Sequence, residues 1–249
     1  MSLSTVSYDT AFLYEKGGRQ INEDSLALMD VLTGSSHMLL AVVADGIGGL
    51  KNGDYASSYT VRRLKVCFEN TSLSERSSDI NYLARCFKKE LYKCHMHLIK
   101  TSKACVDGCG TTLTLLCLIG KRGITVNVGD SHLYHIHRRS IKLIGRDHTD
   151  RFGRLTRCIG RGTYHRIRIH RIRVGKDDTF VLCSDGFYRL GEQSIRELAL
   201  SREKKIDEPL LSDCLDRAFK HITSAGERDN ISAITVHVGS GRDVDPGKE

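Results

Sequence analysis

One pattern constrains the fold of this chain more than any other: apolar runs of strand length stand directly beside aspartates. The four examples are Asp45 after residues 39–44, Asp130 after 126–129, Asp185 after 179–184, and Asp229 just before 231–238. A carboxylate beside a buried strand is costly to desolvate unless a positive charge meets it. If the strand ends converge, the aspartates form a cluster of hard oxygen ligands, which suits Mg²⁺ or Mn²⁺ better than zinc.

A simpler interpretation is that each aspartate only caps a turn, which is the commoner role of a single Asp-Gly pair. Glycine beside the aspartate lets the backbone bend sharply and lets a ligand approach the main chain. Because the same order of apolar run and aspartate recurs four times, the pattern favours the metal-binding interpretation.

Short motifs around these aspartates occur in a fixed order along the chain. They are R-x-x-N-E-D at 19–24, D-G-x-G-G at 45–49, C-G-T-T at 109–112, V-G-D-S at 128–131, S-D-G at 184–186 and D-N-I-S at 229–232. In this order they resemble the metal-dependent type 2C protein serine/threonine phosphatases, in a compact bacterial form. The resemblance extends over about residues 8–238.

The resemblance implies a hydrolase that removes phosphate from phosphoserine and phosphothreonine with a water activated by two Mn²⁺ or Mg²⁺ ions. It implies that Asp45 bridges both ions with help from the Gly46 carbonyl, and that Asp185 and Asp229 ligate one of them. It assigns the remaining roles as follows: Arg19 grips the substrate phosphate, Glu23 and Asp24 hold metal-bound water or orient its shell, and Asn230 supports the ligands. Two divalent ions lower the pKa of a bridging water and neutralise phosphoryl charge.

Four departures from the family pattern limit what can be carried over. Ile47 stands where some relatives have a histidine that is a candidate general acid. A third metal position uses Asp130 together with an aspartate four residues after Asp185, but Arg189 occupies that place, and a cation there opposes a third ion. His132 replaces a common arginine, and the flap that usually follows residues 147–150 is missing.

Residues 165–174 form a basic segment in which arginines alternate with isoleucines until Arg171 breaks the pattern. Period-two alternation predicts a strand with one buried and one basic face. That face is either simply solvated or, with Arg166 and Arg168, binds phosphorylated substrates. Nucleic-acid binding is disfavoured because aromatic residues are only 6% of the chain and tryptophan is absent.

Cysteine and histidine also gather at Cys94, His95 and His97, with Cys105 and Cys109 further on. Two tight ligand pairs of zinc-site type are absent. His95 and His97 cannot share one face of a helix, because residues two apart point in different directions. Buried cysteines and solvated histidines are the better interpretation.

Length and composition favour one domain over residues 1–249, with a core of about 8–238 and a polar tail at 239–249. The 249 residues include only two prolines and no linker-like tract, and the net charge of +8 suits anionic substrates. Nine cysteines without an export signal indicate a reducing cytoplasm, and no apolar run approaches a membrane span. We expect a monomer that binds phosphoproteins, is opposed by a serine/threonine kinase, and has no membrane or nucleic-acid partner.

The order of elements predicts an α/β (α+β) fold. Strands are expected at 7–13, 25–29, 111–119, 124–128, 132–137, 140–144, 165–174, 180–184 and 231–238, and helices at 54–69, 79–100, 192–200 and 207–224. With the resemblance, these elements imply a four-layer α-β-β-α sandwich of two antiparallel sheets flanked by helices. The competing functional hypothesis is an inactive relative that binds phosphoproteins or regulates a partner.

Overall fold

The computed structural model describes residues 6–33, 36–47, 52–102, 108–200 and 206–240. One antiparallel sheet has the strand order β1 (Val6–Glu15), β10 (Ile231–Ser240), β9 (Thr179–Cys183), β6 (His132–His137) and β7 (Ser140–Leu143). The other has the order β2 (Asp24–Thr33), β3 (Ser36–Asp45), β4 (Leu113–Ile119), β5 (Arg122–Val128) and β8 (His170–Arg173). We call them the β1 sheet and the β2 sheet.

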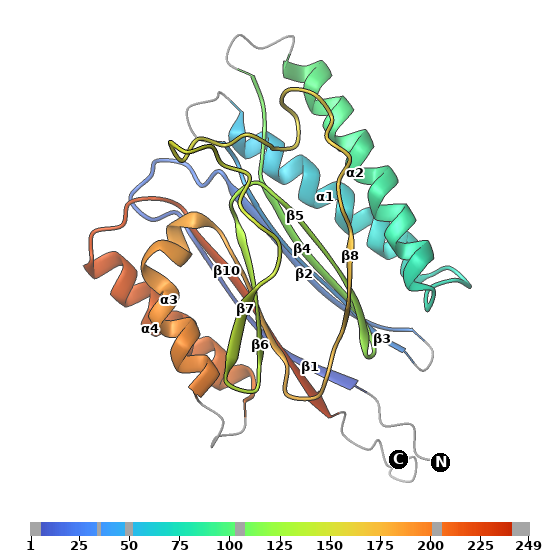
Figure 1. Ribbon diagram of the computed structural model, residues 1–249, viewed down its shortest axis with the longest axis vertical. Helices are drawn as coiled ribbons and strands as arrows, with labels where there is room; N and C mark the ends of the chain where they lie inside the picture. Colours follow the sequence, from blue (N-terminus) through green and yellow to red (C-terminus); the bar gives the residue numbers. More distant parts are fainter. Residues whose placement is uncertain (1–5, 34–35, 48–51, 103–107, 201–205, 241–249) are drawn as a thin grey trace.

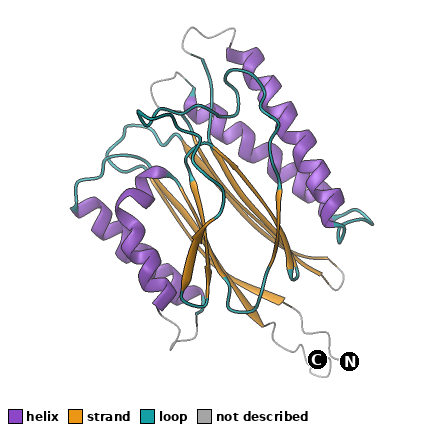
Figure 2. Ribbon diagram, in the orientation of Figure 1, coloured by secondary structure: helices purple, strands orange, loops and turns teal. Residues whose placement is uncertain are grey.

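Among the described residues, four helices cover the outer faces of the two sheets (Figures 1 and 2). Helices α1 (Gly53–Ser72) and α2 (Ile80–Ser102) pack on the β2 sheet, and α3 (Asp185–Leu200) and α4 (Glu208–Ser224) pack on the β1 sheet. Three apolar clusters separate the layers, one beneath each helix pair and one between the sheets. The predicted α-β-β-α sandwich is confirmed.

Strand β3 shows why an unbroken apolar run forms the centre of this fold. Residues 39–44 are all 0% exposed, with Leu40 and Val42 facing the helices and Leu39, Ala41 and Val43 facing the other sheet. A strand buried on both faces needs apolar side chains at every position, so the run does not alternate. The strand ends on Asp45, as the sequence indicated.

The predicted strand at 165–174 is wrong in extent, since only His170–Arg173 is strand. Ile167 and Ile169 pack into the cluster beneath α1 and α2, whereas Ile172 packs between the two sheets. The extra residue at Arg171 therefore moves the apolar side chains from one face of the β2 sheet to the other. The pairing with β5 covers only residues 170–173.

Two further expectations about the helices need correction. Helix α3 begins at Asp185 rather than at residue 192, so the aspartate lies in its first turn. His95, expected in solvent, is buried on α2, and its Nδ1 accepts a hydrogen bond from the Gly160 N–H at 3.2 Å.

Two remaining observations concern the C-terminal segment and the possibility of a membrane span. Residues 239 and 240 belong to β10 rather than to a polar tail, and the rest of the expected tail, 241–249, lies outside the described residues. Among the helices that the structure describes, none combines the length and the apolar character that a membrane span requires.

Candidate metal and phosphate site

The aspartates singled out in the sequence gather at one end of the sandwich. The β2 sheet contributes Asp45 at the end of β3 and Asp24 at the start of β2, which are opposite each other in register. Asp185 follows β9 and Asp229 precedes β10, both in the β1 sheet. Asp130 lies in the connection from β5 to β6, where the chain crosses from one sheet to the other.

Glycines beside two of these aspartates allow the backbones to approach closely. A Cβ atom at Gly46 would lie 2.3 Å from the Gly53 carbonyl oxygen, and one at Gly186 would lie 2.2 Å from the Asn230 carbonyl oxygen. Only glycine fits at either place without a backbone shift. Of the D-G-x-G-G motif, Gly48 and Gly49 lie outside the described residues.

The carboxyl groups are close enough to perturb one another strongly. Burial, followed by the charges of Asp24 and Asp185, raises the pKa of Asp45 well above its usual value. Burial also raises the pKa of Asp24 to about 6, and the Asp24 Oδ2 atom is buried without a hydrogen-bond partner. The pKa values of Asp130 and Asp185 are raised as well, again first by burial and with contributions from neighbouring aspartates.

Two arginines partly neutralise this cluster. The Arg19 Nη2 donates to Asp229 Oδ2 at 3.0 Å, and the Arg189 Nη2 donates to Asp185 Oδ2 at 2.5 Å. Both guanidinium groups are about half exposed, with 50% and 51% of their side-chain surface accessible. The sequence did not predict the pairing of Arg189 with Asp185. The two side chains meet because they lie one helical turn apart, and the helix was predicted to begin only at residue 192.

Asn230 organises the loop that carries Arg19 and Glu23. Its Nδ2 donates to the carbonyls of Lys16 and Ile21 at 2.8 and 3.0 Å, and its Oδ1 accepts from the Glu23 N–H at 2.9 Å. Since the whole amide is engaged with backbone groups, Asn230 supports the site by fixing this loop. Burial and the charge of Asp54 raise the pKa of Glu23.

The C-G-T-T motif supports Asp45 from a neighbouring segment, a role that the sequence did not reveal. The Asp45 N–H donates to Thr112 Oγ1 at 3.0 Å, and Thr111 Oγ1 donates to the Asp45 carbonyl at 2.9 Å. Thr112 Oγ1 also shares a hydrogen bond of 2.7 Å with the Ser131 hydroxyl, beside Asp130. The two threonines thus fix the strand end that carries Asp45.

His132 has a packing role beside the cluster. Its Nε2 contacts Asp147 Oδ1 at 2.9 Å, its Nδ1 contacts the Tyr134 hydroxyl at 2.8 Å, and its ring stacks on Tyr188 at 3.7 Å between centroids. Burial lowers its pKa, although the Asp147 charge acts in the opposite direction. Both ring nitrogens are therefore engaged within the protein.

Divalent ions fit this donor set. Several carboxyl oxygens converge from both sheets, one of them buried without a partner, and burial together with mutual repulsion raises their pKa values. A hard cation removes this repulsion and accepts oxygen ligands of this kind. The carboxylates would hold the ions, and the two exposed guanidinium groups would remain available for an anion.

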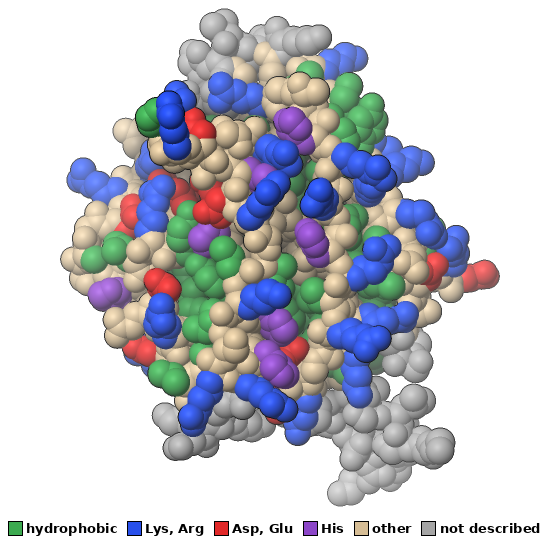
Figure 3. Space-filling model, viewed as in Figure 1, with side chains coloured by type: hydrophobic (Ala, Val, Ile, Leu, Met, Phe, Trp, Pro, Cys, Tyr) green, Lys and Arg blue, Asp and Glu red, His purple; other side chains and the backbone are tan. Residues whose placement is uncertain are grey.

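Arg166 and Arg168 lie apart from the aspartates, in a cavity of about 780 Å³ between α2 and the segment 165–171. Arg85, Lys88, Arg157 and Arg171 also line it, and no described residue that lines it is an aspartate or a glutamate. Figure 3 shows Lys and Arg side chains spread over this face of the molecule. We call this cavity, with its six cationic side chains, the basic groove.

The fold and the aspartate cluster agree with the result of a comparison with known protein families. The Protein phosphatase 2C family matches residues 17–232. The chain belongs to the protein phosphatase 2C family. It is therefore a phosphoprotein phosphatase, a hydrolase acting on phosphorylated proteins, and membership supports dependence on metal ions.

Individual relatives resemble the phosphatase over most of its length. Serine/threonine phosphatase stp of Listeria monocytogenes is 25% identical over 237 residues, which cover 88% of this chain and 90% of that protein. The structure of PppA, a regulatory component of the T6SS in Pseudomonas aeruginosa, is 26% identical with a TM-score of 0.75 over 94% and 99% of the two chains. The catalytic domain of PstP, solved with 2 manganese ions, shares the fold at 21% identity and a TM-score of 0.71, over 95% and 100% of the chains.

Proposed function

We propose that this phosphatase hydrolyses phosphoserine and phosphothreonine in proteins with two Mn²⁺ or Mg²⁺ ions held by the aspartate cluster. The observation that carries the proposal is the convergence of carboxyl groups with raised pKa values from both sheets, in a chain of this family. Such a reaction implies a serine/threonine kinase that phosphorylates the same proteins.

The residues would divide the work as follows. Asp45, the Gly46 carbonyl, Asp185 and Asp229 would ligate the ions, while Glu23 and Asp24 would act through bound water. The ions supply an activated water and neutralise charge on the phosphoryl oxygens. Arg189 lies near both Asp130 and Asp185, and its charge lowers the pKa of each. A cation there disfavours a third ion at Asp130, so we propose two.

Arg19 would bind the substrate phosphate. Its guanidinium already pairs with Asp229, which anchors it at the edge of the cluster while half of its surface stays accessible. A guanidinium offers several N–H donors in one plane, so it can hold a phosphate oxygen with the donors that Asp229 leaves free.

The test is the substitution Asp185→Asn, which keeps the shape of the side chain and removes its charge. We expect it to abolish Mn²⁺-dependent hydrolysis of a phosphothreonine peptide while the circular dichroism spectrum stays that of the native protein. The matched control is Asp213→Asn on α4, whose side chain is 60% exposed and pairs with Arg217. Unchanged turnover by Asp185→Asn, or activity of the native protein in EDTA, would contradict the metal assignment.

The basic groove is the second part of the proposal: it would hold an acidic segment of the phosphoprotein next to the phosphorylated residue. Arg157 lines the groove and also acts electrostatically on His148, whose Nδ1 lies 3.2 Å from the Gly129 N–H beside Asp130. Arg157 therefore connects the groove electrostatically to the segment that carries Asp130. Concave surfaces of one charge concentrate ligands of the opposite charge.

Two variants test the groove. The double substitution Arg166→Glu and Arg168→Glu is expected to raise the KM for an acidic phosphopeptide about tenfold and to leave hydrolysis of p-nitrophenyl phosphate unchanged. The control is Arg196→Glu with Arg217→Glu, which makes the same change in net charge on α3 and α4, on the outside of the β1 sheet. An equal effect of both double variants would show that only the net charge matters.

A further inference from the structure

A second group of candidate ligands lies at the far end of the β1 sheet, and it is independent of the proposed function. His135 and His137 are two residues apart on β6, so their side chains project from the same face of the sheet. Asp178 directly precedes β9, the strand paired with β6. Because Asp185 follows β9 and Asp178 precedes it, the two sites are separated by the length of that strand, about 20 Å.

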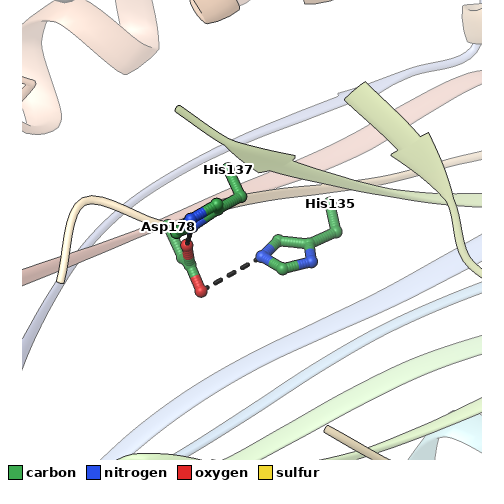
Figure 4. Close-up of side chains that lie close together, drawn as sticks. All are labelled: His135, His137 and Asp178. Carbon is green, nitrogen blue, oxygen red and sulfur yellow. Dashed lines mark hydrogen bonds and ion pairs between the residues drawn. The ribbon is translucent and has the colours of Figure 1, made fainter. Parts of the chain in front are cut away.

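The three side chains converge on one point. The His137 Nδ1 lies 2.5 Å from Asp178 Oδ1, and the His135 Nε2 lies 3.1 Å from Asp178 Oδ2. One ligand atom from each residue can be chosen so that all three lie within 4.8 Å of one another. Figure 4 shows both imidazole rings turned toward the carboxylate.

Neighbouring groups hold these ligands in place. The Asp178 carboxylate is 2% exposed, and its Oδ2 accepts a hydrogen bond from the Gly175 N–H at 2.8 Å. The His135 ring stacks on Phe180 with 4.6 Å between centroids and 9° between planes. The buried His135 Nε2 contacts Asp178 without a hydrogen bond of good geometry. Such support from an outer layer of residues is typical of ligands that hold a metal ion.

The site is also accessible. The His137 side chain is 53% exposed, and His135 lines a cavity of about 440 Å³ that separates β7 from β8. An ion can therefore enter from solvent, and a water molecule can complete its coordination. The cavity wall includes Lys142 and Arg173, which would favour an anionic additional ligand over a further cation.

We propose that His135, His137 and Asp178 bind a single divalent transition-metal ion, with Zn²⁺ as the ion that best suits the ligands. Imidazole nitrogen suits zinc, whereas the all-oxygen aspartate cluster suits Mg²⁺ or Mn²⁺. Ligands about 2.0–2.1 Å from a tetrahedral zinc lie roughly 3.4 Å apart, so the observed separations need shifts of on the order of 1 Å. The bound ion would tie the β6–β7 hairpin to the turn before β9.

The experiment measures zinc retained by chelator-stripped full-length protein after gel filtration in the presence of excess Mg²⁺, together with the visible spectrum after Co²⁺ replaces zinc. We expect one zinc per chain and the intense absorption of a four-coordinate Co²⁺ site. His137→Ala, at a half-exposed position, is expected to weaken zinc binding at least about tenfold. His137→Gln serves as a second variant if alanine lowers the melting temperature.

Two controls separate this site from others. His221→Ala removes an exposed histidine on α4, and Asp45→Asn disables the aspartate cluster; we expect both to retain zinc as the native protein does. If the native protein retains no zinc, the three residues form only an ion pair and the proposal is wrong. It is also wrong if zinc retention survives both His137 variants or is lost with Asp45→Asn.

Discussion

At the scale of the residue, Asp24 shows what the site costs the protein when no ion is bound. Its carboxyl group is 2% exposed and lacks a full set of partners, and burial together with neighbouring aspartates raises its pKa to about 6. A buried carboxylate of this kind lowers stability whenever it is ionised. The residue is thus suited to a site that is completed by a cation rather than to a structural ion pair.

This predicts an inverse pH dependence for the stability of the metal-free protein. A carboxyl pKa that rises on folding, from 3.8 to about 6, stabilises the folded state only while the group is protonated. That contribution is complete below about pH 4 and is lost as the pH rises through 6. The loss is on the order of 2–3 kcal/mol.

Urea denaturation in EDTA at pH values from 4 to 7.5 measures this effect for the native protein and for Asp24→Asn. The variant should lack this part of the pH dependence and should be the more stable of the two at pH 7.5. Parallel stability curves for the two proteins would contradict the assignment of the raised pKa to Asp24.

At the scale of the element, the sequence correctly predicted the helices and strands whose apolar pattern is uninterrupted. The run 39–44 and its aspartate predicted β3 and the position of Asp45, and the helix expected at 79–100 is α2, Ile80–Ser102. The start of α3 was missed, because the chain passes from β9 into the helix without a turn that the sequence could mark. For that reason the contact between Arg189 and Asp185, one helical turn apart, was also missed.

Whether two histidines can bind one ion also depends on whether they lie on a helix or on a strand. His95 and His97 were examined as ligands and rejected, because residues two apart diverge on a helix. His135 and His137 have the same spacing, but on a strand that spacing places both on one face. The predicted strand 132–137 therefore already placed the two histidines on one face. The third ligand, Asp178, became apparent only from the pairing of β6 with β9.

Helix α3 also allows a prediction about metal affinity. Arg189→Ala frees one oxygen of Asp185 and removes a positive charge from the cluster, so the Mn²⁺ concentration for half-maximal activity should fall about threefold to tenfold. The measurement is a Mn²⁺ titration of p-nitrophenyl phosphate hydrolysis. Arg196→Ala, which removes an arginine paired with Glu192 further along the helix, should change nothing. A higher Mn²⁺ requirement for Arg189→Ala would show instead that Arg189 orients Asp185.

At the scale of the whole molecule, the two sheets contact each other through apolar side chains, and the aspartate cluster lies across one end of that contact. Each sheet pairs its own strands, so among the described strands no backbone ladder joins one sheet to the other. Metal ions shared by Asp45 from the β2 sheet and by Asp185 and Asp229 from the β1 sheet would therefore add a link between two halves whose contact is mainly apolar. Side-chain hydrogen bonds such as that from the Tyr14 hydroxyl to the Asp24 carbonyl, 3.0 Å long, also join the two halves.

Because the buried aspartates repel one another at one end of the sandwich, the metal-free sandwich should loosen unevenly. Amide hydrogen exchange in EDTA should be faster at the ends of β3 and β9 next to Asp45 and Asp185 than at their opposite ends, and Mn²⁺ should remove most of that gradient. Equal exchange at both ends without metal would contradict this. If the gradient is observed, the aspartate cluster controls how readily the two sheets separate. The supply of metal then governs the lifetime of the folded protein as well as its chemistry.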